Sequence, residues 1–381
     1  MRSTLFQYLH SQGWTTDSLG ELDSENTLVV VFGNRNFHDD QTPFKELRAK
    51  YPQSAVVGCS TSGEIHGRKL FDDSLSVAVL AFDQTRIKVA SADVPSGADS
   101  AKVGRALADQ LHGPDLADVF VLSNGLNVNG TQLVAGMNAV FDRDVRVTGG
   151  LAGDGEAFER TWVLLGDDAA LDRTVAVGFY GENVVFTHGS QGGWDRFGPE
   201  RRVTRSQDNK LFELDGQPAL ELYKKYLGDH ADGLPATGLL FPLEIHQPGF
   251  PDKRLVRTIL AVDEAENSLT FAGDIPTGWV AQLMKANFDR LVDGAETAAQ
   301  AMQNDAHGDQ PVCFAISCVG RRLVLRERTE DEIEAVADLL PDDARLVGFY
   351  SYGELSPHVE GEACDLHNQT MTLTLVSERS A

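Results

Sequence analysis

Three copies of one strand-end loop organise this chain. Residues 57–65 (VGCSTSGEI) pass from apolar, β-branched residues into small and polar ones, then a glycine and an acid. Residues 146–155 (RVTGGLAGDG) and 346–355 (LVGFYSYGEL) repeat the pattern. It is typical of a buried strand that enters a tight loop with amides and hydroxyls at the tip. Three copies indicate an internally repeated scaffold whose loops carry the function.

The elements around these loops follow one order three times. Each round has an apolar strand, an amphipathic helix, a second strand, the Gly-rich loop and further strands. The expected elements are strand 28–32, helix 43–51, a hairpin of strands 74–82 and 87–92, and helix 101–111; strand 119–122, helix 131–141 and strands 145–148, 161–165, 175–179 and 184–188; then strand 312–317, helix 329–340 and strands 345–348 and 370–376. This order predicts a mixed α/β (α+β) fold with helices on the outer faces of its sheets.

Different material separates the second and third rounds. It comprises a helix at 218–227, a hairpin of strands 254–262 and 268–271, and a long helical pattern at 276–302. A chain of 381 residues is too long for one compact core. We therefore expect two domains, residues 1–215 and 216–381.

The amino-acid composition restricts the classes of molecule that this chain can bind. Asp and Glu outnumber Lys and Arg by 57 to 33, which gives a net charge of −24. Such a surface repels phosphate backbones and anionic lipids, so we expect neither nucleic-acid nor membrane binding. Residues 1–20 contain no apolar core of signal-peptide length, and no apolar run in the sequence has the length of a membrane span. The four cysteines are too few and too scattered for a disulfide framework. These features predict a soluble protein of the reducing cytoplasm.

Two of the loops imitate known motifs without meeting their requirements. Residues 149–155 are rich in glycine, but a strand is expected next, so no helix amides would meet a phosphate. Residues 58–63 approach the G-x-S-x-G nucleophile elbow, yet Ser62 stands where the second glycine is needed. Cys59 closes an apolar strand, where a cysteine is more often packing than a redox thiol. We therefore expect a binding protein and not an enzyme.

Two histidines, one on an apolar strand face and one in a loop, are candidate haem or metal ligands. Strand alternation places His188 on the same face as Val184 and Phe186. His246 is expected in a loop rich in ring-shaped residues. A histidine on an apolar strand face is most often a satisfied core histidine and not a haem ligand. For His246 the alternatives are lining an apolar pocket and bracing a turn.

Arg257 interrupts an apolar strand at residues 255–260. A buried arginine must bind a carboxylate, and Glu64, Glu354 or an anionic ligand are the candidates. The alternative is that Arg257 lies on an exposed strand face.

With these loops in this order, the chain resembles the FIST sensory family, which has an N-terminal and a C-terminal FIST domain. The matching stretches are residues 57–65, 149–154, 191–194 (QGGW), 213–219 (ELDGQPA), 255–257 (LVR), 275–278 (IPTG), 352–354 (YGE) and 367–370 (HNQT). The likeness extends from residue 28 to residue 376.

The resemblance implies a small-ligand sensor of signal transduction. A stand-alone chain of this size resembles the NosP group of the family, haem-containing nitric-oxide sensors that regulate partner histidine kinases. Haem, nitric oxide and a histidine kinase acting in trans are therefore expected, and a homo-oligomer stays open. The alternative is a sensor of a small polar metabolite such as an amino acid, held by the loops with Arg257 on its carboxylate.

These arguments define the expected site. His188 and His246 are the expected haem-binding residues, with His188 as the metal ligand. The residues expected to bind a small ligand are Cys59, Ser60, Thr61, Glu64, Gly150, Asp154, Trp194, Arg257, Tyr352 and Glu354.

Overall fold

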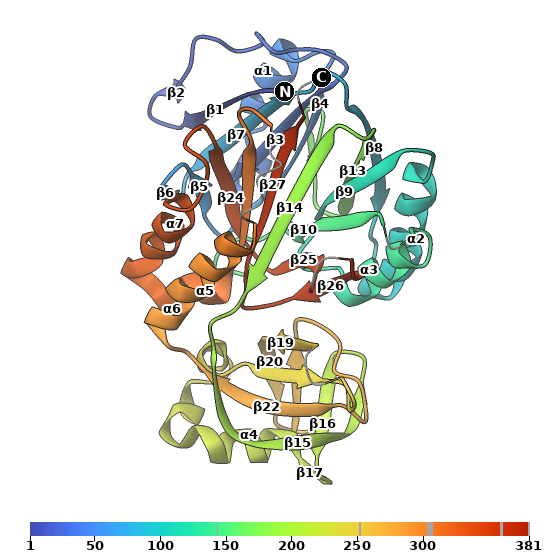
Figure 1. Ribbon diagram of the computed structural model, residues 1–381. Helices are drawn as coiled ribbons and strands as arrows, with labels where there is room; N and C mark the ends of the chain where they lie inside the picture. Colours follow the sequence, from blue (N-terminus) through green and yellow to red (C-terminus); the bar gives the residue numbers. More distant parts are fainter. Residues whose placement is uncertain (143, 251–252, 303–307, 359–360, 380–381) are drawn as a thin grey trace.

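The chain forms a larger body and a smaller unit beside one end of it (Figure 1). The computed structural model describes residues 1–142, 144–250, 253–302, 308–358 and 361–379. Within these residues three sheets build the larger body, and a fourth builds the smaller unit. The predicted mixed α/β fold, with helices outside the sheets, is confirmed. None of the described helices is long and apolar enough to cross a membrane.

The first sheet is built on the parallel pair β3 and β4. Its strand order is β12 (Asp168–Ala170), β11 (Val163–Leu165), β4 (Ala55–Ser60), β3 (Thr27–Gly33), β7 (Ser74–Ala81), β1 (Arg2–Leu9) and β2 (Gly13–Trp14). The connection from β3 to β4 contains η1 (Arg35–His38) and α1 (Thr42–Lys50). Every residue of β3 is buried, as expected of a strand that is covered on both faces.

The second sheet has the same parallel pair, here β9 and β10. Its order is β26 (Cys364–His367), β25 (Gly353–Pro357), β10 (Arg146–Leu151), β9 (Leu116–Ser123), β13 (Arg173–Tyr180) and β8 (Arg86–Asp93). The helices η2 (Gly97–Asp99), α2 (Ser100–Leu111) and α3 (Gly130–Asn138) belong to this round. Helices α2 and α3 lie together on the outside of the body (Figure 1).

The third sheet is built on the parallel pair β23 and β24. Its order is β14 (Val184–Gln191), β27 (Met371–Glu378), β23 (Val312–Cys318), β24 (Arg345–Ser351), β5 (Glu64–His66) and β6 (Lys69–Phe71). Its helices are α5 (Phe288–Ala301), α6 (Val319–Leu325), η5 (Arg326–Arg328) and α7 (Thr329–Ala337). They lie on the opposite side of the body from α2 and α3 (Figure 1).

Each sheet is completed by a hairpin that another round supplies. The chain leaves β4 through the first loop, and β5 then pairs with β24 of the third sheet. It leaves β10 through the second loop, and β11 pairs with β4 of the first sheet. It leaves β24 through the third loop, and β25 pairs with β10 of the second sheet. The three repeated loops are therefore the points at which the chain crosses between sheets.

The three sheets turn one face each toward a common apolar core. Phe314 of the third sheet lies there with its ring centroid 6.3 Å from that of Phe32 and 5.0 Å from that of Phe120, which come from the first and second sheets. The opposite faces pack against helices in three separate outer clusters. Burial of apolar surface on both sides of every sheet holds the body together.

The smaller unit is inserted between β14 and α5 of the third round. Its strands are β19 (Arg254–Arg257), β18 (Leu243–His246), β22 (Val280–Lys285), β15 (Asp195–Gln207), β16 (Lys210–Leu214), β21 (Ser268–Phe271) and β20 (Ile259–Asp263), with β17 (Gln217–Pro218) paired to β16. Its helices are α4 (Ala219–Leu227), η3 (Gly228–Gly233) and η4 (Ala236–Leu240). The expected boundary between residues 215 and 216 falls inside this unit, between β16 and β17.

Two of the expected elements are wrong. The long helical pattern at 276–302 is the strand β22 followed by α5, whose N-cap Asn287 accepts a hydrogen bond from the Arg290 amide. Pairing of β22 with β15 and β18 overrides the helical pattern. The expected hairpin of 74–82 and 87–92 does not form, since β7 pairs with β1 and β3 whereas β8 pairs with β13.

Gly149→Ala is expected to destabilise the protein severely. Gly149 has a φ of +143°, and a Cβ there would lie 1.9 Å from the carbonyl oxygen of Val121. Backbone strain and overlap with the neighbouring strand should together lower the free energy of unfolding by about 3 kcal/mol or more, measured by urea denaturation. Gly181→Ala is the control, because its φ is +121° but nothing lies within 4 Å of the added Cβ. Gly181→Ala should lower the free energy of unfolding by about 1–2 kcal/mol. Equal losses of stability in the two variants would contradict the prediction.

Candidate functional site

Glu64 anchors the first crossing loop from inside the protein. Its side chain is 0% exposed. The hydroxyl of Thr61 donates to one carboxylate oxygen, and the hydroxyl and amide of Ser74 donate to the other at 3.0 Å and 3.2 Å. Burial, partly offset by these hydrogen bonds, raises the pKa of Glu64 to about 8. Glu64 therefore connects the loop to the start of β7.

Glu354 repeats this arrangement in the third loop. It is also 0% exposed. The hydroxyl of Ser351 donates to it at 2.6 Å, and the hydroxyl and amide of Thr370 donate at 2.8 Å and 3.2 Å. Burial again raises the pKa to about 8. In both loops a hydroxyl three residues before the glutamate completes the same hydrogen-bonded turn.

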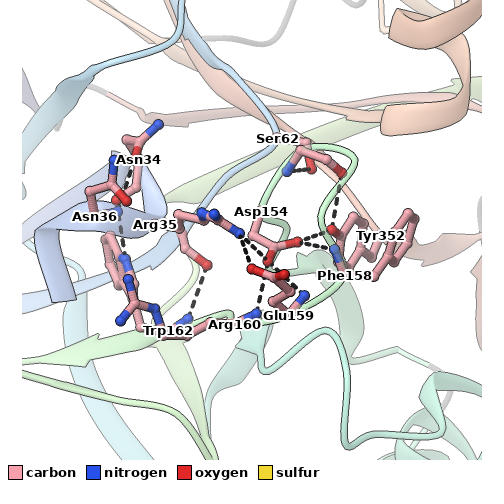
Figure 2. A network of polar contacts seen from close by, with 12 residues as sticks. Asn34, Arg35, Asn36, Ser62, Asp154, Phe158, Glu159, Arg160, Trp162 and Tyr352 are labelled. Atoms are coloured by element: carbon pink, nitrogen blue, oxygen red, sulfur yellow. Dashed lines mark hydrogen bonds and ion pairs between the residues drawn. The ribbon is translucent and has the colours of Figure 1, made fainter. Parts of the chain in front are cut away.

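Asp154 is the acid of the second loop and the centre of a polar network (Figure 2). It accepts hydrogen bonds from the backbone amides of Phe158, Glu159 and Arg160 at 2.8–2.9 Å, and also from the Tyr352 hydroxyl. Although burial acts in the opposite direction, these hydrogen bonds hold the pKa of Asp154 below its usual value. A charged carboxylate thus ties the second loop to the third.

Cys59 and Ser60 serve packing and strand pairing. Cys59 is buried in the common core, and burial raises the pKa of its thiol well above the usual value. The Ser60 hydroxyl accepts a hydrogen bond from the Trp162 amide at 3.0 Å. Both side chains therefore have protein partners within the body.

Gly150 and Trp194 also lie inside the structure. A Cβ on Gly150 would lie 2.8 Å from the Ile316 side chain, so the position has room only for glycine. Trp194 lies in the segment that leads from β14 into the smaller unit, and its indole donates to the carbonyl oxygen of Gln369 at 2.9 Å. Trp194 therefore anchors that connection to the body.

A cavity of about 770 Å³ lies between the larger body and the smaller unit. It is lined by residues 95–98, Ala101, 125–129, Gln132, Leu151, Phe158, Cys318, Val319 and Tyr352 of the body, and by Asp208, Asn209, Leu239, Thr258, Leu260, Phe271 and Ala272 of the smaller unit. Its volume is in the range of small-molecule sites. Of the residues expected to bind a ligand, Tyr352 lines it.

A second cavity, of about 850 Å³, lies on the other side of α6. Its lining includes Ser62 and Asp72, and Arg322 binds both of them, the Asp72 carboxylate at 2.7 Å and the Ser62 carbonyl oxygen. Two charged groups of this wall, Arg322 and Asp72, thus pair with each other. Val319 and Leu239 line both cavities.

Arg257 is buried, so the expectation of an exposed strand face is wrong. It is 2% exposed, and burial lowers the pKa of its guanidinium to about 10. It donates to the carbonyl oxygens of Asp274, Val256 and Leu366 at 3.0–3.1 Å. Backbone carbonyl groups thus take the place of the expected Glu64 or Glu354, and Arg257 joins the smaller unit to β26.

Neither expected haem ligand lines either cavity. His188 is half-buried on β14, an edge strand of the third sheet, opposite Thr374. His246 is not in a loop: it ends β18, with its Nδ1 3.4 Å from the Arg254 guanidinium. A haem ligand needs a slot beside its imidazole for the macrocycle. Neither of the two cavities places such a slot beside these histidines, and haem binding stays a prediction.

The structure adds site residues that were not expected. Thr258 and Asn127 line the cavity, and Asn368 and Gln369 lie next to its wall. Asn368 and Gln369 belong to the stretch HNQT, whose likeness to the family was the one available signal. Their proximity to Cys318 and Leu239 depends on long-range packing, which no local pattern encodes.

Together the fold and the cavity define a mixed α/β protein with a ligand-sized site between its body and an inserted unit. The model of the FIST N domain matches residues 27–217, and the model of the FIST C domain matches residues 219–357. The chain therefore belongs to the FIST family, whose domains are small-molecule sensor domains of signal transduction. The family expected from the sequence is confirmed.

Two further comparisons give weaker information. The chain is 25% identical over 350 residues to an uncharacterized protein of Methanocaldococcus jannaschii, across 82% of this chain and 66% of that protein. The chain thus spans just under two thirds of this relative's length. A crystal structure of cyanuric acid hydrolase from A. caulinodans aligns over 99% of both chains at 10% identity, with a TM-score of 0.38. That score is too low to support an argument about fold or function.

The double variant Glu64→Gln/Glu354→Gln is expected to weaken the pH dependence of stability. Between the unfolded value of 4.5 and the folded pKa of about 8, the folded protein keeps protons that the unfolded chain has released. The contribution of these two carboxyl groups to wild-type stability therefore falls as pH rises through this window, and glutamine removes that contribution. Urea midpoints measured across the window should fall less in the variant.

The control for this experiment is Glu221→Gln, an exposed position on α4. It should keep the wild-type pH profile. Superimposable profiles of the double variant and the wild type would show that the two buried carboxyls do not titrate in this way.

Asp154→Asn is expected to loosen the second loop. The new NH2 group would face N–H or O–H donors whichever oxygen it replaces, because both oxygens of Asp154 accept hydrogen bonds. The free energy of unfolding should fall by about 2–4 kcal/mol, and proteolysis within residues 155–160 should accelerate. Glu159→Gln, which changes an exposed partner of Arg35, is the control and should stay within about 1 kcal/mol of the wild type. Similar effects of the two substitutions would refute the role of Asp154.

Proposed function

We propose that this protein is a sensor that binds a small, neutral, polar metabolite in the 770 Å³ cavity without converting it. The observation that carries the proposal is the cavity itself, which joins the third crossing loop, through Tyr352, to the inserted unit. Sites of this kind combine apolar walls with a few polar groups that fix the ligand's orientation. Here Asn127, Asn209 and Thr258 supply polar groups among apolar residues such as Leu151 and Phe271.

The charge of the lining favours a neutral ligand. Among the described lining residues none is Lys, Arg or His, and Asp208 carries the one acidic side chain. A buried carboxylate or phosphate without a cationic partner would be strongly disfavoured. The net charge of −24 on the whole chain adds to this selection against anions.

Contacts between the smaller unit and the body connect ligand binding in the cavity to a change that a partner protein can detect. The smaller unit touches the body around the cavity through Asp274, which accepts from Asn129 at 2.8 Å and Gln132 at 2.7 Å. The smaller unit also touches the body through Lys253, whose ammonium group pairs with the Asp365 carboxylate at 2.6 Å. A ligand that contacts both parts biases how they sit against each other. We propose that a partner protein, of which a histidine kinase is the class implied by the family resemblance, responds to this difference.

The narrower hypothesis of a haem-based nitric-oxide sensor has the NosP resemblance as its support. His188 and His246 lie away from the cavity, and the polar contact of His246 is with a cationic guanidinium. We therefore assign no step to haem and none to nitric oxide.

A thermal-shift screen of the full chain against neutral and zwitterionic metabolites tests the proposal. A ligand at about 100 times its Kd stabilises the folded state by about 2.7 kcal/mol, which corresponds to a rise in Tm of about 3 °C for a chain of 381 residues. Ala101→Trp, which fills the cavity from α2, should abolish the shift.

The matched control is Ala106→Trp, an exposed position on the same helix, which should keep the shift. A screen without any stabilising compound, or an undiminished shift in Ala101→Trp, would rule out this cavity as the sensor site.

A further inference from the structure

We infer that the smaller unit is a lid on the 770 Å³ cavity, which pivots about a buried anchor at Arg321 and is fastened on the opposite side by Asp274. This inference rests on the proposed function, because it names how access to the same site is controlled. It follows from the unequal way in which two sides of the smaller unit are attached to the body.

The two connections between the smaller unit and the body lie against each other. The chain enters the unit after β14, through Gly192 and Gly193, and returns to the body at α5. A Cβ on Gly193 would lie 2.0 Å from the carbonyl oxygen of Arg290 in α5, so the two connections are in direct contact. Adjacent connections of this kind form a hinge, because rotation of one part against the other requires changes in the backbone angles of only a few residues.

Arg321 anchors both connections from inside the body. Its side chain lies on α6 and is 0% exposed. The guanidinium donates to the carbonyl oxygen of Gly192 on the first connection, and at 2.7 Å to that of Leu291 on the second. Glu332 pairs with the same guanidinium at 2.6 Å and accepts two further hydrogen bonds from hydroxyls of the third sheet. Breaking such a buried pair is strongly disfavoured, so the anchor holds while the unit moves.

An apolar cluster around this anchor spans both parts. Met284 and Leu240 of the smaller unit pack there with Leu291 and Val324 of the body, and with Trp194 of the first connection. Pulling the unit away from α6 would expose these side chains to water. The α6 side of the unit is therefore the side that stays attached.

On the side of α3 the apolar cores of the two parts are separate. Helix α3 lies across the body from α6 (Figure 1). Leu133 of α3 and Leu366 of β26 belong to a cluster of the body, whereas Leu255 and Phe271 belong to a cluster inside the smaller unit. Moving the parts away from each other here divides neither cluster, so the contacts to be broken are mainly polar.

Asp274 is the main polar contact on the α3 side. Its carboxylate accepts hydrogen bonds from Asn129 Nδ2 at 2.8 Å and from Gln132 Nε2 at 2.7 Å, and its backbone amide donates to the Thr131 hydroxyl at 3.3 Å. These partners lie at the N-terminal end of α3, where the helix dipole favours a carboxylate. All four residues are partly exposed, so water can replace each hydrogen bond when the unit moves.

Two further polar contacts join the smaller unit to β26 of the body. Arg257 donates to the carbonyl oxygen of Leu366 at 3.0 Å, but its other two partners are carbonyl oxygens of the smaller unit, which move with it. Lys253 and Asp365 form a partly exposed ion pair, and each is hydrated when the pair separates. Opening on this side therefore leaves no buried charge without a partner.

The cavity lies between the anchor and Asp274. Val319, two residues before Arg321, lines it from α6, whereas Asn129 and Gln132 line it from α3. Release of Asp274 thus widens the cavity from the α3 side while the α6 side stays closed. A ligand that contacts both parts favours the closed state.

Cysteine labelling of the full chain tests the lid without any ligand. Cys318 lines the cavity, whereas Cys313, on the same strand, is buried in an outer core cluster of the body. Asp274→Ala should raise the rate at which N-ethylmaleimide labels Cys318 about tenfold, because the closed state loses the hydrogen bonds of a carboxylate. The rate at Cys313 should stay at the wild-type value. Mass spectrometry of the peptides measures the two rates separately.

A distance measurement separates pivoting from detachment. Cysteines introduced at Gln217 of the smaller unit and at Ala135 on α3 or Gln300 on α5, all exposed positions, carry the spin labels. The native cysteines are buried, so the labels attach selectively. By double electron–electron resonance, Asp274→Ala should lengthen the distance from Gln217 to Ala135 more than the distance from Gln217 to Gln300. Equal lengthening of both distances would indicate detachment and overturn the pivot.

The matched control is Glu264→Ala, because Glu264 pairs with Lys224 inside the smaller unit. It should keep the wild-type labelling rates and distances. Unchanged labelling of Cys318 in Asp274→Ala overturns the lid. So does equal acceleration at Cys318 and Cys313, which would indicate unfolding of the whole chain.

The outcomes also separate the two proposals, because neither measurement uses a ligand. If Asp274→Ala changes nothing while a metabolite shifts the Tm and Ala101→Trp blocks that shift, the lid is overturned and the proposed function stands. If Asp274→Ala opens the cavity as expected but no metabolite binds, the lid stands and the proposed function fails.

Discussion

The larger body depends on the burial of three apolar sheet faces against one another. No round of the chain completes its own sheet: β5, β11 and β25 each leave their round and pair with a strand of another. One round alone would expose an apolar face and leave the edge of its parallel pair without a partner. The exchange supplies both the missing hydrogen bonds and the missing apolar contacts, so the three rounds depend on one another for their stability.

This exchange explains the acid in each repeated loop. A chain that crosses through the interior carries polar groups that must be paired. Glu64, Glu354 and Asp154 accept hydrogen bonds from their own loop and from a neighbouring strand or loop. The polar residues of the loops are therefore largely occupied by the protein itself. The cavity reaches the third loop at Tyr352, which lines it together with residues of the inserted unit.

Much of the fold was predictable from local pattern. Apolar runs such as residues 28–32 and 312–317 are strands because burial on both faces requires apolar residues throughout. The pattern at 276–302 was misleading, because an apolar stripe in six residues fits a strand as well as a helix. The turn at residues 83–85 did not join β7 to β8 as a hairpin. Instead, its amides donate to the carboxylate of Glu378, a distant residue.

The sequence by itself determined the family, the mixed α/β class and the three loops, because these follow from motifs and from the period of apolar residues. The tertiary structure decided which sheet each hairpin joins and where the cavity lies, because both depend on contacts between residues far apart in the chain. Arg257 illustrates the difference. Its sequence context required a buried partner or an exposed face, but only packing placed it against the carbonyl oxygens of Asp274 and Leu366. Likewise, the stretch HNQT carried a family likeness, whereas folding brought Asn368 and Gln369 behind the cavity wall.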